Sequence, residues 1–256
     1  MQRQNRAIVL VAVISLVAGA ILGMGTMSLI DGKKGADSSG QDLQMLYISA
    51  VEDAAFAEAE EIMPLVSLTK DDPLVTWDES GERVLLCTWH NYPESYPAGK
   101  TVTLDWGNVW TFTPDELAQK YKAEFSQVSD WELRLNQIIG FAPDSEHSTF
   151  TTFWVAPSDV CRPACQPDPA SGEMKTQLDQ DSAEESYTLW FNENILDSYF
   201  YGAYPWTRLG YTYDWADNGS EYGLSEFLIR QGAEVEVVDT RTTEEFLEQI
   251  NQKNTK

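Results

Sequence analysis

The sequence predicts an α+β fold: a mostly antiparallel sheet with several helices, preceded by one N-terminal transmembrane helix. Two observations support this prediction. An uncharged apolar run near the N-terminus is long enough to cross a membrane, and the rest of the chain groups strand-like and helix-like segments instead of alternating them. We therefore divide the chain into a cytoplasmic tail, an anchor, a linker, a helical stalk and one extracytoplasmic domain, over residues 1–6, 7–30, 31–42, 43–63 and 64–256.

The predicted anchor, residues 7–30, carries no charge. A helix of this length spans about 36 Å, against a bilayer core of roughly 30 Å. An uncleaved anchor and a cleaved signal peptide are both open, and the length of the run and the lack of a clean Ala-x-Ala site before Asp31 favour the anchor. Two flanking arginines balance two flanking lysines, so charge does not set the orientation. The short N-terminal tail favours a single-pass protein with its C-terminal domain outside the cytoplasm.

The next segment predicts a helix from Leu43 to about Met63, which Pro64 ends. This helix is either a stalk or a cover for the domain that follows. Its apolar positions recur at spacings of three and four. They are Ile48, Val51, Ala55, Ala59 and Ile62.

Two hairpins are predicted next. Strand-like residues 74–77 and 83–90 flank an Asp-Glu-Ser-Gly loop, and residues 101–104 and 109–112 flank Asp-Trp-Gly-Asn.

Two capped helices follow. Thr113 precedes a proline at the first helical position and a glutamate three residues after the cap, and residues 129–132 repeat the capping spacing before Gly140, a natural C-terminal stop. Residues 148–155 then read as a strand, and the proline-containing stretch 158–186 as a long surface loop.

The C-terminal part predicts a helix over residues 184–201, then strands at 208–215, 224–230 and 233–240, with a Gln-Gly turn between the last two. Thr242 opens a final short helix with a third capping box.

The composition excludes several classes of function. The chain carries 17 Lys and Arg against 41 Asp and Glu, a formal net charge of −24. Because this charge repels polyanions, we expect no nucleic-acid partner. Two histidines and three cysteines leave few ligands for zinc or haem, and we expect neither a metal site nor a cofactor.

The cysteines suggest a disulfide and a core thiol. Cys161 and Cys165 lie four positions apart in a proline-containing loop, and outside the cytoplasm they are able to close a small disulfide. A metal site there lacks two further soft ligands. Cys87 and His90 point to opposite faces of a strand, so a core cysteine is favoured over a catalytic dyad.

The aromatic residues concentrate between Tyr199 and Tyr222, where nine of 24 are Phe, Tyr or Trp. Aromatic faces beside carboxylates suit sugar rings, and the same side chains also build ordinary cores. A glycan or protein partner would be contacted by Trp206, Tyr211, Tyr213 and Trp215.

Two polar residues, Arg208 and Glu226, lie inside apolar, strand-like surroundings, where a half-buried ion pair is one explanation. The segments Trp-Thr-Arg-Leu-Gly-Tyr from Trp206 and Ser-Glu-Phe from Ser225 resemble those of uncharacterised exported or membrane-anchored bacterial proteins. This resemblance extends from about residue 74 to 240 and implies no established activity.

A second resemblance concerns Glu226, which precedes an apolar strand, a Gly turn and a returning strand, as in ADP-ribosyltransferases. That resemblance implies an NAD-using enzyme in which Glu226 orients the ribose. Arg208 is the second candidate catalytic residue, but no Arg is clearly placed before Thr149, Thr151 and Thr152, which loosely match the family's strand. The sequence departs from the family at Leu224, where a paired acid usually stands. Two hypotheses follow: a tethered binding or envelope-associated domain, and an enzyme centred on Glu226.

Overall fold

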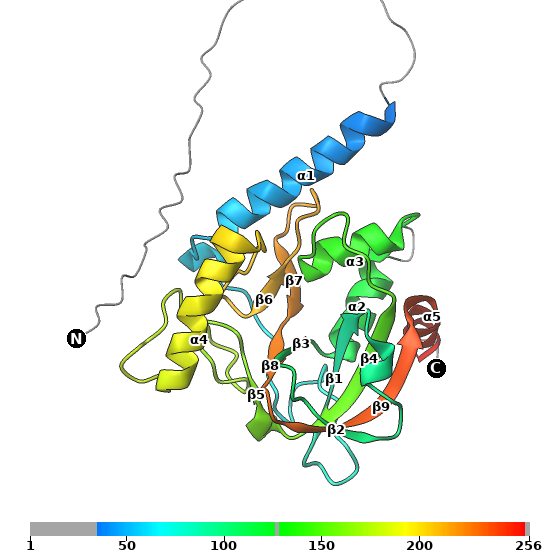
Figure 1. The fold of residues 1–256 in the computed structure, drawn as a ribbon, viewed down its shortest axis with the longest axis vertical. Helices are drawn as coiled ribbons and strands as arrows, with labels where there is room; N and C mark the ends of the chain where they lie inside the picture. Colours follow the sequence, from blue (N-terminus) through cyan, green and yellow to red (C-terminus); the bar gives the residue numbers. More distant parts are fainter. Residues whose placement is uncertain (1–34, 126–127, 254–256) are drawn as a thin grey trace, which may run out of the picture. The chain divides into compact units, whose positions relative to one another are not determined.

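The computed structural model describes residues 35–125 and 128–253, and it is an α+β structure with antiparallel sheets (Figure 1). The predicted anchor, residues 7–30, lies outside the described residues. Within the described part, no helix is both long and apolar enough to span a bilayer.

The strands form one four-stranded sheet and two smaller ones, and every pair is antiparallel. The large sheet has the order β1 (Val84–His90), β4 (Thr149–Val155), β9 (Glu234–Thr242) and β2 (Thr101–Thr103). The second sheet has the order β3 (Val109–Thr111), β8 (Phe227–Ile229) and β5 (Val160–Cys161), and the third pairs β6 (Tyr211–Tyr213) with β7 (Tyr222–Ser225). Two backbone hydrogen bonds between Cys87 and Phe112 join the first sheet to the end of β3.

The helices are α1 (Gly35–Ala54), α2 (Pro114–Lys120), α3 (Trp131–Ile139), α4 (Glu185–Leu196) and α5 (Thr243–Lys253). Three predicted helix ends are confirmed. The Thr113 hydroxyl accepts a hydrogen bond from the Glu116 N–H, and Gly140 ends α3 in the left-handed region at φ 81°. Thr242 and Glu245 form the reciprocal bonds of a capping box before α5.

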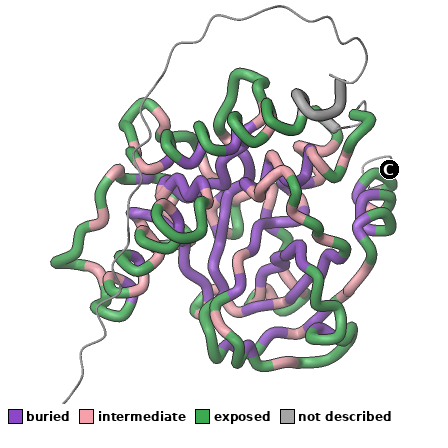
Figure 2. Tube along the Cα trace, turned by 45° about the horizontal axis from the view of Figure 1, so that its top comes forward, coloured by how far each residue is buried: buried purple, intermediate pink, exposed green. Residues whose placement is uncertain are grey.

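The core lies on both faces of the large sheet, whose strands β1 and β4 are buried along most of their length (Figure 2). On one face, side chains of α2, α3 and α5 pack against Trp89 and Phe150. On the other, apolar residues of β1, β4 and β9 pack against β8. Because β1 is covered on both sides, it is apolar without interruption from Val84 to Cys87.

The helix predicted from Leu43 to Met63 is correct in kind and wrong in extent. It begins at Gly35 and ends at Ala54, well before Pro64. The buried side is formed by Tyr47, Ala50, Val51 and Ala54, whereas Ile48 is 40% exposed. The predicted apolar stripe is therefore about one residue out of phase with the buried side, because this helix carries apolar residues on two adjacent faces.

The hairpin predicted over residues 101–112 is wrong, because its two strands belong to different sheets. β2 pairs with β9, and β3 pairs with β8. In the earlier hairpin, residues 74–77 contribute only a bridge between Trp77 and Val84. The Gln-Gly turn after β8 likewise connects strands of two sheets. Turn chemistry is local and visible in a sequence, but it does not determine which strand becomes the partner.

Candidate functional site

Glu226 is the single residue between β7 and β8, at the point where the chain leaves one sheet and enters another. Its backbone N–H donates to the Gly210 carbonyl at 3.0 Å, which fixes the crossing. The side chain is 2% exposed. Across the residues that the structure describes, neither carboxyl oxygen has a hydrogen-bond partner. A buried carboxyl without a partner is costly to stability and therefore calls for an explanation.

Glu226 is one of the residues that line a pocket of about 500 Å³, and both of its carboxyl oxygens are shielded from solvent behind the wall. Eight of the twenty residues that line this pocket are Trp, Tyr or Phe. Among them, Trp106 is 55% exposed and packs edge-on against the buried Tyr96, with ring centroids 5.5 Å apart. We call this space the aromatic pocket; Glu226 is its buried carboxyl, and Trp106 stands on its exposed side.

Most other polar groups of the aromatic pocket are already bonded to the protein. The hydroxyls of Thr111, Thr212 and Tyr204 donate to backbone carbonyls at 2.6 to 3.1 Å. His90 accepts the Tyr92 N–H at Nδ1 over 2.9 Å, so its Nε2–H faces a hydroxyl oxygen 2.8 Å away. Burial lowers the pKa of His90 to about 4, which keeps the ring neutral. The buried wall thus leaves Glu226 as its one unsatisfied side-chain acid.

The environment of Glu226 favours its protonated form. Burial raises the pKa of this carboxyl to about 8, and the nearby Arg162 and Trp206 side chains offset only part of the rise. Arg162 is itself fully buried, and its guanidinium donates to the carbonyls of Val66 and Gly210. It also lies over the Phe227 ring at 4.6 Å. Arg162 is therefore held by the backbone and makes no hydrogen bond to Glu226.

The predicted ion pair between Arg208 and Glu226 does not form within the described part of the chain. Arg208 donates to the Ala55 carbonyl at 2.7 Å and lies over the Tyr199 ring at 5.4 Å. Its backbone has a positive φ of 58°. Arg208 thus joins the segment after α1 to the core, away from the aromatic pocket.

The four predicted binding aromatics are all buried. Trp206 donates its indole N–H to the Pro163 carbonyl at 2.8 Å. Tyr211, Tyr213 and Trp215 line a second pocket, of about 640 Å³, between α1 and the β6–β7 hairpin. The aromatic pocket is instead formed by residues that the sequence did not single out, above all Tyr96, Trp106 and Trp110.

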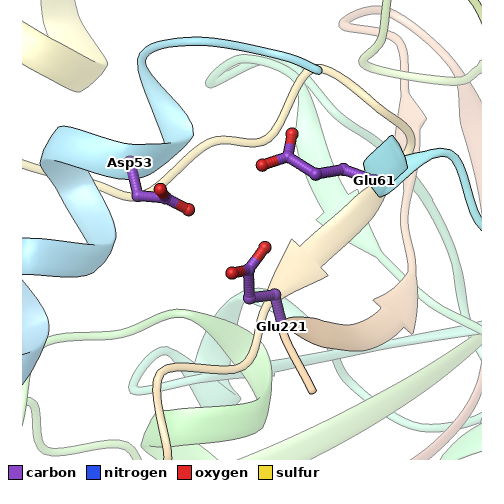
Figure 3. Close-up of side chains that lie close together, drawn as sticks. All are labelled: Asp53, Glu61 and Glu221. Carbon is purple, nitrogen blue, oxygen red and sulfur yellow. The ribbon is translucent and has the colours of Figure 1, made fainter. Parts of the chain in front are cut away.

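The second pocket holds a group of three carboxylates, Asp53, Glu61 and Glu221, with ligand oxygens within 4.8 Å of one another. Figure 3 shows them pointing toward one another from α1, from the segment after it and from the β6–β7 hairpin. Desolvation and mutual repulsion raise the pKa of Glu61 and of Glu221. Tyr213 relieves part of the repulsion by donating to Asp53 at 3.0 Å.

The three cysteines are buried thiols in this structure. Cys161 and Cys165 pack in the same cluster beside Trp206, and the disulfide between them stays a prediction. Burial raises the pKa of Cys87 well above its usual value, so this thiol is a core residue and a poor nucleophile.

Comparisons with family models, with characterised proteins and with solved structures yield no match. The function of the protein is therefore inferred from the geometry of the site.

Proposed function

We propose that this protein is a membrane-tethered, extracytoplasmic binding protein that holds a small organic ligand in the aromatic pocket. The observation that carries the proposal is Glu226, a buried carboxyl without a hydrogen-bond partner in the described chain, on the wall of that pocket. Once the shielded carboxyl turns toward the pocket, a ligand group that bonds to Glu226 supplies the partner that the fold withholds. This accounts for a residue that otherwise only lowers stability.

The size and chemistry of the pocket support a compact, largely apolar ligand. Its volume of about 500 Å³ falls within the usual range for small-molecule sites. Since the hydroxyls of Thr111, Tyr204 and Thr212 are already bonded to carbonyls, a sugar with many hydroxyls would find fewer partners on the wall. An aromatic or aliphatic body with one polar group fits the wall better.

The alternative of an NAD-using enzyme centred on Glu226 has less support. Among the described residues that line the aromatic pocket, none is Lys or Arg. A dinucleotide carries a charged pyrophosphate, which binding sites usually meet with cations or with the N–H groups of a helix N-terminus. The net charge of −24 also opposes its approach.

Blocking the aromatic pocket is expected to abolish ligand binding. Asn194 lines the pocket from α4 and is half-buried, so Asn194→Trp places an indole in the cavity without removing core packing. Saturation-transfer NMR of monocyclic aromatic compounds, each with one polar group, is expected to show contacts with wild type and none with this variant. The matched control, Asn192→Trp, adds the same side chain at an exposed position of α4 outside the pocket. Equal signals from all three proteins would contradict the proposal.

The tether is tested separately. The full chain is expected to stay in the membrane pellet after alkaline extraction, and protease added to intact spheroplasts is expected to digest the domain. A variant lacking residues 7–30 is expected to remain in the soluble fraction, because that run is the predicted anchor. Release of the wild-type chain by alkali, or a mature protein that begins after residue 30, contradicts an uncleaved anchor.

A further inference from the structure

We infer that the ligand of the aromatic pocket is an organic monocation, with an ammonium group against the Glu226 carboxylate and an apolar body against the aromatic wall. The inference rests on the proposed function and adds the chemical class of the ligand. It follows from the positions of Glu226, Trp106, Trp110 and Tyr96 around one cavity.

The first argument is complementarity of charge. Glu226 and the exposed Asp197 are the carboxylates that line the aromatic pocket, and no lining residue in the described chain is Lys or Arg. His90 is neutral, because burial lowers its pKa to about 4. An anion would meet only negative or neutral groups there. A cation would have the exposed Asp197 beside it, and also Glu226 once its shielded carboxyl turns toward the pocket.

The second argument is the aromatic wall. Ring faces carry negative charge density and attract ammonium groups, more strongly when water is excluded. Trp106 and Tyr96 contact each other edge-on at 5.5 Å, and Trp110 lines the same cavity. Such walls bind alkylammonium groups in many proteins, whereas a carboxylate ligand is repelled by the ring faces.

The third argument is the proton balance. Without ligand, Glu226 is mostly protonated at neutral pH, since burial raises its pKa to about 8. When R–NH₃⁺ binds, the carboxyl O–H bond breaks, the proton leaves to the buffer and Glu–COO⁻ pairs with the intact ammonium ion. Binding therefore releases about one proton near neutral pH. The affinity for the ammonium ion therefore rises about tenfold for each unit by which the pH is raised, until Glu226 is ionised in the unliganded protein.

Other titratable groups do not complicate this balance. The charged and titratable groups that interact electrostatically with Glu226 come from the residue after β5, from α4, from the segment after α4, and from β6. They are Arg162, Tyr187, Tyr199, Tyr204 and Tyr211. Burial raises the pKa of each of these tyrosines far above neutrality, and the lowered pKa of Arg162 is still about 10. Glu226 is thus the group of this set that titrates between about pH 5 and 9.

The test compares phenylalkylammonium chlorides with the matched phenylalkanols, using the full chain in nanodiscs of zwitterionic lipid. Calorimetric titration in phosphate and in Hepes at the same pH gives the number of protons released. We expect the ammonium series to bind, with about one proton released near pH 7, and the alcohols to bind at least tenfold more weakly. Glu226→Gln is expected to weaken ammonium binding about tenfold or more and to remove its pH dependence. Glu193→Gln, on the exposed side of α4, is expected to change neither.

Each outcome separates the two proposals. If the alcohols bind as tightly as the ammonium ions, or if no proton is released, the ligand class is wrong while the pocket still binds small molecules. If neither series binds to wild type, the binding function itself is contradicted. The proton count on wild type keeps the test decisive even if Glu226→Gln fails to fold.

Discussion

Replacing Glu226 with methionine is expected to stabilise the unliganded protein by about 3 kcal/mol more at pH 7 than at pH 4.5. In the folded state the pKa of Glu226 is about 8, against an ordinary value of 4.5. Below pH 4.5 the carboxyl is protonated in both states and carries no penalty. As the pH rises toward 8, the unfolded chain releases the proton and the folded chain does not, so wild type loses stability. Over about 2.5 pH units at 1.36 kcal/mol each, the loss is about 3 kcal/mol.

Urea unfolding at several pH values measures this difference. Comparing how the free energy of unfolding changes with pH in the two proteins removes any constant packing effect of the methionine. Glu193→Met is the matched control, because it removes an exposed carboxylate from α4. Its effect is expected to stay within about 0.5 kcal/mol at every pH. Parallel stability curves for wild type and Glu226→Met would show that Glu226 ionises normally, and would remove the basis of the proton balance.

A gain in stability on losing Glu226 would also bear on function. A protein selected for stability alone has no use for an acid at this position, since a methionine of similar size fills the space. Binding sites commonly retain such unfavourable groups because the ligand satisfies them. The variant is therefore expected to be more stable and unable to bind the ammonium series, and the two measurements together separate this trade-off from a general loss of structure.

The parts of the fold that could be predicted from the sequence are those set by local interactions. Thr113 and Gly140 mark helix ends because capping bonds form within a few residues. β1 and β4 were recognised from runs of apolar and β-branched residues. The partners of β2 and β3 could not be predicted, because pairing depends on packing between segments more than 100 residues apart in the chain.

The candidate site was predictable only in its central residue. Glu226 stood out because a charged residue inside an apolar segment is unusual, and the structure does bury it. Its expected partner, Arg208, contacts Ala55 instead. The wall of the pocket comes from segments as distant as Tyr96 and Tyr204, and no local pattern relates these residues. The one available signal was Trp106, a large aromatic residue in a predicted turn, where it has little reason to be unless it contacts something.

Asp214→Ala is expected to destabilise the protein by about 3 to 5 kcal/mol. Arg134 of α3 donates two hydrogen bonds to the Asp214 carboxylate, at 2.7 and 2.6 Å, and both side chains are buried. Removal of the aspartate leaves the guanidinium with Glu124 as its carboxylate partner, at 2.8 Å on a more exposed side chain. Asp217→Ala, in the exposed turn that follows, is the matched control and is expected to cost less than about 0.5 kcal/mol.

The double variant Arg134→Met/Asp214→Leu is expected to recover most of the lost stability, because well-packed apolar side chains often replace a buried ion pair at little cost. If the double variant is as unstable as Asp214→Ala, the loss comes from packing and the argument from the broken Arg134–Asp214 pair is wrong. The pair also matters for binding. Arg134 ties α3 to the β6–β7 hairpin, and Ile139 at the end of α3 lines the aromatic pocket and accepts the Tyr204 hydroxyl at 2.9 Å. Asp214→Ala is therefore expected to weaken ligand binding as well, whereas the double variant, in which this helix end is held by packing, is expected to restore it.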